Sequence, residues 1–140
     1  MTETNVEELP KRIELRPNVM KICLPSNGID LSTSLASSFE RCSYFVTVDS
    51  DQQETFTTFL NDAQTAARGA SIQAAQLLID QQVELVITPQ IDSIALNILQ
   101  RAGIKTYLGV DDTIQENINL VLQGRLVEIR IVKDSSNTND

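Results

Sequence analysis

Two short segments of the chain carry residue types that bind anions or metals. The first, Ser38–Cys42, ends in Arg41 and Cys42, and the second runs Arg68-Gly69-Ala70-Ser71. A thiolate is a soft metal ligand, and the neighbouring arginine is expected to lower the pKa of the Cys42 thiol. The second segment opens a helix near Ser71, where free N–H groups and an arginine favour an anion. The alternatives are a half-exposed cysteine, an ordinary serine N-cap and a solvated arginine.

The amino-acid composition excludes most catalytic mechanisms. The 140 residues include no histidine and two cysteines, which excludes Ser-His-Asp catalysis, His-ligated zinc and a Cys₄ site within one chain. No nucleotide-binding or nucleophile-elbow motif is present, so we expect no enzyme. A net charge of −8, without a basic half, argues against nucleic acid as a partner.

The other candidate ligands have simpler explanations. Cys23 lies in an apolar run and is interpreted as a small buried hydrophobe, with a metal or redox thiol as the alternative. Scattered acids are interpreted as surface charges rather than a magnesium cluster, because the first strand carries no carboxylate. These acids are Asp30, Glu40, Asp49 and Asp62.

Hydrophobic periodicity predicts alternating strands and helices in the second half of the chain. Helices are expected at about 71–82, 92–102 and 113–123, with Asp92 capping the second and Asp112 or Thr113 the third. The apolar stripe of the first helix includes Ile72, Ala75 and Ile79, and burial is expected for Ile98, Leu99, Ile118 and Leu122 in the second and third helices. Strands are expected at Val19–Leu24, Tyr44–Val48, Thr55–Leu60, Val83–Thr88 and Ile104–Leu108, with residues 49–53 as a hairpin loop. Leu126–Val132 is either a last strand or an extension of the third helix.

This order predicts one α/β domain over residues 19–132, between a polar arm (1–18) and a disordered tail (133–140). The sheet is expected to be mixed and ribonuclease-H-like, in the order 3-2-1-4-5, with strand 2 antiparallel and helices on both faces. Ligands collect at the carboxyl ends of parallel strands. Four segments should meet there, namely Pro25–Asp30, Ser37–Cys42, Asn61–Ala70 and Thr88–Gln90.

Three stretches of the sequence resemble a known family. They are Phe39–Val48, Ser71–Leu78 and Val83–Gly109, of which IALNILQRAGIKTYLGV is the most specific. Together they resemble the dinitrogenase iron-molybdenum cofactor-binding family of nitrogenase accessory proteins. The resemblance covers residues 19–125 and implies a ribonuclease-H-like fold and the binding or carriage of iron–sulfur or molybdenum-containing clusters.

The resemblance implies a binding edge built from Ser38, Phe39, Arg41, Cys42, Arg68, Gly69 and Ser71. Ser38 replaces a histidine common in the family and Glu40 replaces a glycine, which leaves Cys42 as the candidate metal ligand. Arg41 and Arg68 are expected to offset the negative charge of the ligand. The function expected is a non-enzymatic carrier of an iron–sulfur or molybdenum-containing cluster, with cluster assembly or acceptor proteins as partners. The alternative is a cluster-free interaction or regulatory module. The absence of an apolar leader or membrane span predicts a cytoplasmic protein.

Overall fold

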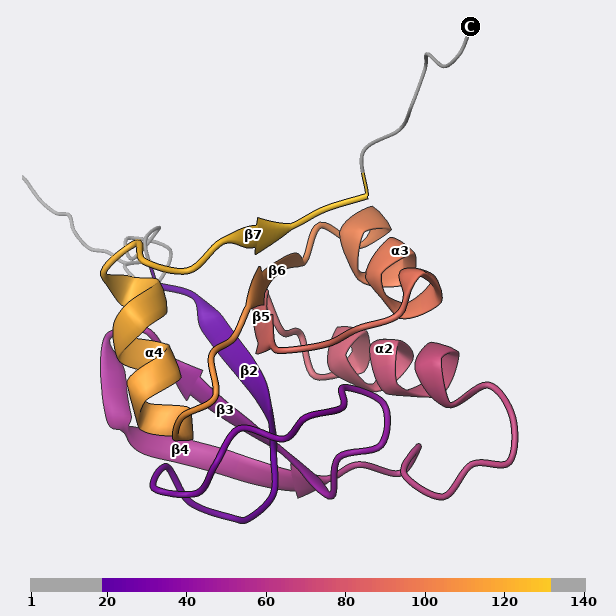
Figure 1. Ribbon diagram of the computed structural model, residues 1–140, viewed down its shortest axis with the longest axis horizontal. Helices are drawn as coiled ribbons and strands as arrows, with labels where there is room; N and C mark the ends of the chain where they lie inside the picture. The colour runs from indigo at the N-terminus through magenta and orange to yellow at the C-terminus, as the bar shows by residue number, and fades with distance from the viewer. Residues whose placement is uncertain (1–18, 132–140) are drawn as a thin grey trace, which may run out of the picture.

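Within residues 19–131, six strands form one mixed sheet in the order β4-β3-β2-β5-β6-β7 (Figure 1). The computed structural model describes residues 19–131, so the expected arm over 1–18 and tail over 133–140 lie outside the described residues. At the centre, β2 (Lys21–Ser26) pairs antiparallel with β3 and parallel with β5 (Leu85–Thr88). The first five strands therefore stand in the order expected from the sequence, with the second one antiparallel.

The hairpin beside β2 has a tighter turn than the sequence suggested. Strand β3 (Tyr44–Asp49) and strand β4 (Gln52–Leu60) leave only residues 50 and 51 between them, where a five-residue loop was expected. The pairing register shifts at this end, because Val48 faces Phe56 whereas Asp49 faces Gln52. The polar residues taken for loop are thus the bulged start of β4, since a bulge accommodates extra residues in one strand.

The other edge of the sheet settles the alternatives left open for residues 126–132. Strand β6 (Lys105–Leu108) runs parallel to β5, and the two-residue strand β7 (Glu128–Ile129) pairs antiparallel with it. The chain therefore leaves the third helix and adds a short last strand. The side chain of Gln100 exchanges two hydrogen bonds with the backbone of Ile131, 2.9 and 3.0 Å long, which fastens the chain beyond β7.

Three helices begin and end within two residues of the expected positions. They are α2 (Ala70–Asp80), α3 (Ser93–Arg101) and α4 (Ile114–Leu122). Asp92 accepts a hydrogen bond from the N–H of Ala95 and caps α3, and Thr113 rather than Asp112 caps α4. Gly103 and Gly124 follow α3 and α4 with φ of 83° and 71°, the left-handed conformation that ends many helices.

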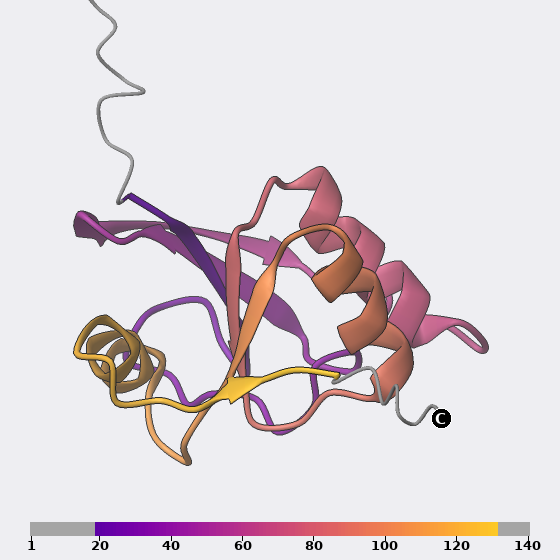
Figure 2. The same cartoon turned by 90° about the horizontal axis from the view of Figure 1, so that it is seen from above.

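Helices cover both faces of the sheet, with α2 and α3 on one side and α4 on the other (Figure 2). The α2–α3 side buries a core that includes Phe45, Leu78 and Leu99. The α4 side buries a smaller core that includes Ile22, Ile87 and Ile118. No helix in the described range is long and apolar enough to cross a membrane.

Two of the four residues expected in the helix cores are less buried than predicted. Leu99 and Ile118 are fully buried, but Ile98 is only half-buried and Leu122 is 44% exposed. Ile72, interpreted as part of the apolar stripe of the first helix, is 53% exposed. Each helix contacts the sheet along a narrow stripe, so an apolar residue one position off that stripe faces outward.

Candidate functional site

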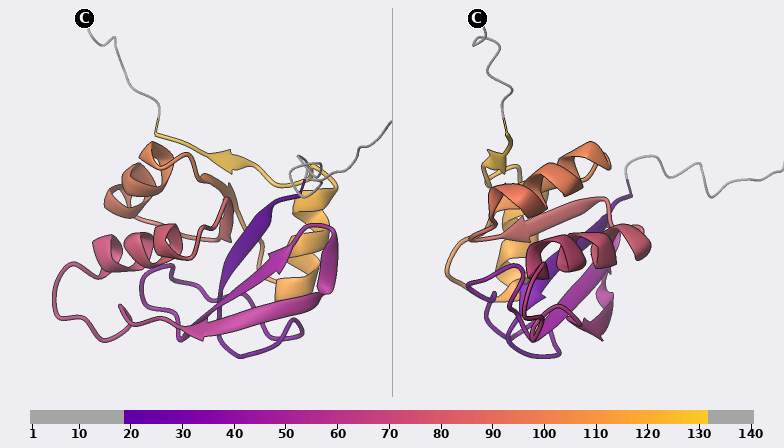
Figure 3. Two further views of the ribbon diagram at one scale, coloured as in Figure 1. Left: turned by 180° about the vertical axis from the view of Figure 1, so that it is seen from behind. Right: turned by 90° about the vertical axis from the view of Figure 1, so that its right-hand side faces the viewer.

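Three of the segments expected to form a binding edge follow the carboxyl ends of β2, β4 and β5. The fourth, Ser37–Cys42, directly precedes β3. Figure 3 shows the loop after β2 and the loop between β4 and α2 at the same end of the sheet, with α2 beginning beside them. Phe39, Cys42, Ala63 and Ala70 belong to one buried cluster. The structure therefore brings Ser38–Cys42 and the start of α2 together.

Arg41 joins the two segments. Its Nη1 donates hydrogen bonds to the backbone carbonyl oxygens of Gln64, at 3.0 Å, and Ala66, at 2.9 Å. Its backbone N–H donates to the Ser38 hydroxyl oxygen at 3.2 Å. The guanidinium was expected to neutralise a ligand, but here it fastens the loop between β4 and α2 against the segment before β3. Its role is therefore the positioning of that loop.

Asn61 is a second connection at this edge that sequence reasoning missed. Its side chain is buried, and Nδ2 donates to the carbonyl oxygens of Glu40 and Cys42 at 3.0 and 2.9 Å. Its Oδ1 accepts from the N–H of Ala63 at 3.0 Å. An asparagine that directly follows a strand commonly forms such a turn, which is the sequence signal that was available.

Phe39 and Cys42 lie in the core rather than on the binding edge. Phe39 is fully buried against Phe45, with ring centroids 5.5 Å apart. Cys42 is 4% exposed, and burial raises the pKa of its thiol to about 12, so the expectation of a lowered pKa is wrong. The guanidinium of Arg41 binds the loop carbonyls instead of a thiolate, and burial opposes ionisation. Cys23 is a buried hydrophobe as expected.

The N-terminus of α2 offers backbone donors. Its N-cap is Gly69, with φ of 70° and no side-chain cap, so the alternative that Ser71 is an ordinary N-cap is wrong. The N–H groups of Ala70, Ser71 and Ile72 have no hydrogen-bond partner within residues 19–131, since the first helical bond runs from Gln73 to Gly69. These groups carry the positive end of the helix dipole.

The hydroxyl of Ser71 already has a partner. It donates a hydrogen bond to Oδ2 of Asp92, whose Oδ1 caps α3. One carboxylate therefore connects the starts of α2 and α3, and its negative charge lies near the donors of α2. A bound anion would have to approach from the Arg68 side, where the guanidinium is exposed.

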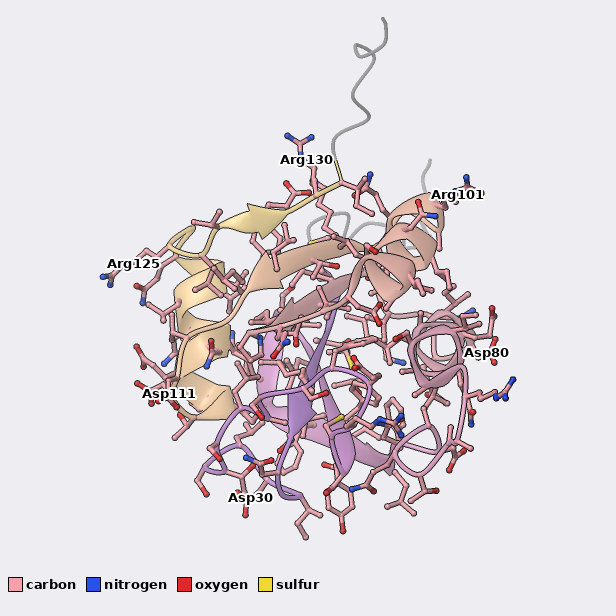
Figure 4. The ribbon with its side chains drawn as sticks, turned by 45° about the vertical axis from the view of Figure 1, so that its right-hand side comes forward. Asp30, Asp80, Arg101, Asp111, Arg125 and Arg130 are labelled. Atoms are coloured by element: carbon pink, nitrogen blue, oxygen red, sulfur yellow. The ribbon has the colours of Figure 1, made fainter. Side chains whose placement is uncertain are left out.

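Charges around the molecule are uneven. In Figure 4 the side chains of Arg101, Arg125 and Arg130 project outward near the end that carries β7. Asp30 and Asp111, on the loops after β2 and β6, project outward near the opposite end. The edge that receives the strand ends therefore carries acids as well as Arg68, and its attraction for anions is local.

Few side chains at this edge of the sheet could ligate a metal cluster directly. Within the described residues, no three His, Cys, Asp or Glu side chains are grouped so as to hold a metal ion. Both thiols are buried, and their pKa values are raised mainly by burial. An anionic group could be held at this edge by N–H donors and Arg68, and a thiolate would contribute only after the loops had opened.

Two of the proteins that this chain resembles are of similar length. The chain is 30% identical over 114 residues to an uncharacterized protein of Methanocaldococcus jannaschii, covering 80% of this chain and 93% of the relative. The apo form of the orange protein from Desulfovibrio gigas has a TM-score of 0.75 and 27% identity, covering 79% of this chain and 92% of that one.

A third similar structure and a family model agree with these two comparisons. A Thermotoga protein described as belonging to the DUF35 family has a TM-score of 0.70 and 28% identity, covering 84% of this chain and 99% of that one. The family model described as dinitrogenase iron-molybdenum cofactor matches residues 20–124, which is most of the described domain. The chain therefore belongs to the dinitrogenase iron-molybdenum cofactor family.

Proposed function

We propose that this protein is a non-enzymatic, cytoplasmic carrier that binds an anionic metallocluster as cargo and passes it to assembly or acceptor proteins. The observation that carries the proposal is the family match over residues 20–124, together with the likeness to the apo orange protein along 92% of that chain. The ribonuclease-H-like description of the sheet belongs to the same proposal, and the strand order β4-β3-β2-β5-β6 supports it.

The cargo site we propose is the edge between Ser38–Cys42 and Arg68–Ser71. Free N–H groups at Ala70, Ser71 and Ile72 provide donors for the sulfur or oxygen atoms of an anionic cluster. The exposed guanidinium of Arg68 provides a charge-assisted donor beside them. Arg41 and Asn61 hold the surrounding loops, so they position the site rather than contact the cargo.

Within this site, Phe39 and Gly69 have structural tasks. Phe39 anchors the segment that carries Ser38, and Gly69 allows the left-handed turn that starts α2 without a side-chain cap. Cys42 is the candidate metal ligand, and it would reach cargo only when the segment from Phe39 to Cys42 moves outward. Since a buried thiol resists ionisation, binding through Cys42 should be weak near neutral pH.

The second candidate is an interaction module that uses the same scaffold without a cluster. The absence of any three-ligand group within residues 19–131 favours it. The two candidates differ in a simple observable, because protein purified without oxygen should carry metal and colour only if it is a carrier. Metal analysis of such protein is therefore the first step of the test.

An anaerobic titration with tetrathiomolybdate tests the carrier proposal through visible absorbance. We expect weak 1:1 binding by the wild type and about tenfold weaker binding by Arg68→Ala, the loss of one charge-assisted hydrogen bond. Ser38→His with Glu40→Gly should tighten binding, because it adds a borderline ligand and removes a negative charge. Cys42→Ser should weaken binding only if the thiol becomes a ligand.

Arg101→Ala is the matched control for Arg68→Ala. Arg101 is also an exposed arginine, but it lies in the last turn of α3, away from the proposed edge. Equal binding by both alanine variants would place the cargo elsewhere. No binding by the wild type and no metal in anaerobically purified protein would support the cluster-free module instead.

A further inference from the structure

The core on the α4 side of the sheet is open beside the helix. Within residues 19–131, α4 covers its face of the sheet alone, whereas α2 and α3 share the other face (Figure 2). Beside α4 lies an apolar groove of about 460 Å³. Ile22, Leu85 and Tyr107 line it, and all three belong to the α4-side core or pack against it. The groove is therefore an opening in that core.

The rest of the lining comes from three places in the chain. Val121 and Leu122 contribute from the end of α4, and Asp51 contributes from the turn between β3 and β4. Val19 and Met20 contribute from the residues that lead into β2. The groove thus lies at the amino ends of β2 and β5, opposite the edge proposed to bind cargo.

The chain that leads into this groove carries a matching apolar pattern. Residues 1–18 lie outside the described residues, and they join the domain at Val19. Residues 12–16 read RIELR, in which Ile13 and Leu15 alternate with charged residues. This alternation is typical of an extended segment with one buried face. The following dipeptide, Pro17-Asn18, favours a turn, so the chain is suited to reverse direction before β2.

The covalent connection keeps this segment close to the groove. Leu15 is four residues before Val19, so it stays within about 14 Å of a residue that lines the groove, and Ile13 stays within about 21 Å. A tether this short gives an effective concentration in the millimolar range. A modest attraction between the segment and the groove is therefore sufficient for docking.

Charge also favours this segment. Residues 11–16 contain three basic side chains and one acidic side chain, in a chain whose net charge is −8. The hairpin turn beside the groove carries Asp49 and Asp51, and both side chains are exposed. The basic segment is accordingly attracted to the part of the domain where the groove opens.

The other segment outside the described domain fits the groove poorly. Residues 132–140 contain one apolar residue, Val132, and carry a net negative charge. They follow Ile131, whose backbone is fastened by two hydrogen bonds to Gln100 of α3. Helix α3 covers the opposite face of the sheet (Figure 2). Of the two segments, the one that precedes β2 has both the apolar residues and the position.

We propose that residues 12–16 dock in this groove as an extended strap, with Ile13 and Leu15 against Tyr107 and Leu122. Glu14 then faces away from the groove, and the basic residues of the strap lie at its rim. Docking removes apolar surface of both the strap and the groove from water, so it closes the α4-side core and stabilises the domain.

Disulfide formation within the full chain tests the strap. Oxidation of Leu15→Cys combined with Leu122→Cys should give a disulfide within one chain, because Leu122 lies at the rim and is 44% exposed. Glu14→Cys combined with Leu122→Cys is the matched control, since its tether differs by one residue but its side chain faces outward. We expect the first pair to form its disulfide at least about tenfold faster. The native thiols are buried and do not compete.

Urea unfolding provides a second measurement without added cysteines. Ile13→Ser combined with Leu15→Ser should raise the equilibrium constant for unfolding at least about tenfold, because the burial of two apolar side chains is lost. Glu14→Ser should change this constant by less than about twofold, as at other exposed positions.

Three results would overturn the proposal. Equal disulfide rates for the cysteines at positions 14 and 15 would mean that the segment moves freely, and an unchanged unfolding constant in the double serine variant would mean that it buries nothing. Disulfides formed only between chains would show that a second copy fills the groove. The double serine variant should bind tetrathiomolybdate as the wild type does, so a failure of the strap leaves the carrier proposal standing.

Discussion

The Nη1 atom of Arg41 donates a hydrogen bond to the backbone carbonyl oxygen of Gln64 over 3.0 Å, and the same atom reaches Ala66. Two segments that are far apart in the sequence are thereby joined at the edge proposed to bind cargo. From the sequence, the positive charge of Arg41 was expected to face a bound ligand. In the structure, its guanidinium binds carbonyl groups of the protein itself. The order of the loop before α2 should depend on this side chain as well as on Asn61.

Arg41→Ala should loosen the loop between β4 and α2 without unfolding the domain. Because Arg41 is exposed, we expect a loss of only about 1 kcal/mol in the free energy of unfolding. Amide hydrogen exchange should accelerate at residues 64–68, where the carbonyl groups lose their partner, while Leu99 and Val86 exchange as before. Unchanged exchange over 64–68 would show that the guanidinium does not hold the loop.

Stability should fall at alkaline pH because burial raises the pKa of the Cys42 thiol to about 12. In the unfolded chain the thiol ionises near its ordinary value of 9.0, so above this pH the unfolded state binds fewer protons than the folded state. The contribution of the buried, protonated thiol to the free energy of unfolding is complete below pH 9 and is lost as the pH rises toward 12. For this one group, the free energy of unfolding should fall by at most about 1.4 kcal/mol per pH unit.

Urea unfolding at about pH 8, 9.5 and 10.5, values chosen on either side of the ordinary thiol pKa of 9.0, measures this loss. In Cys42→Ala the dependence on pH should be shallower, because one of the two buried thiols is absent. Parallel pH curves for the wild type and the variant would contradict the raised pKa. All other ionisable groups are the same in both proteins, so the difference between the two pH curves reports on the Cys42 thiol.

The burial pattern of α3 and α4 predicts a graded series of stability losses. Leu99→Ala should cost about 2–5 kcal/mol, because this fully buried leucine leaves a cavity. Ile98→Ala should cost less, since Ile98 is only half-buried. Leu122→Ala, at a position that is 44% exposed, should change the free energy of unfolding by less than about 1 kcal/mol. Equal losses at positions 98 and 99 would contradict the assigned helix face.

Gly109, within the most family-like stretch, is predicted to accept a side chain only if its neighbours shift. A Cβ atom there would lie 2.5 Å from Cδ2 of Leu35, 3.1 Å from Cγ2 of Ile87 and 3.2 Å from Oδ1 of Asn117. We expect Gly109→Ala to cost about 1–3 kcal/mol by overpacking. In a Leu35→Ala background the cost should shrink, and a double-mutant cycle measures the coupling. Additive losses would contradict the clash.

Much of the fold could be predicted from local pattern. Apolar runs and helix periodicity located the main strands and helices because burial on a sheet imposes these periods. The turn between β3 and β4 could not be placed, since residues 49–53 are polar whether they lie in a loop or in a bulged edge strand. Leu122 and Ile72 were misjudged because periodicity fixes a helical stripe only to within one position.

The candidate site was predicted at the level of segments and not of side-chain roles. Strand order brought Ser38–Cys42 beside the start of α2, as expected. The pKa of Cys42 could not be foreseen, because a polar sequence neighbourhood does not reveal that the thiol packs against Phe39 and Asn61. The partner of Arg41 is a backbone carbonyl 23 residues away, and a sequence alone carries no signal for such a contact.

The most direct test of the carrier proposal is an amide chemical-shift titration of the wild type with tetrathiomolybdate under anaerobic conditions. We predict saturable shifts that are largest at Gly69, Ala70, Ser71 and Ile72, whose N–H groups begin α2, with smaller shifts near Ser38. Saturable shifts confined to other parts of the sheet, or no shifts at all, would contradict the proposed cargo site.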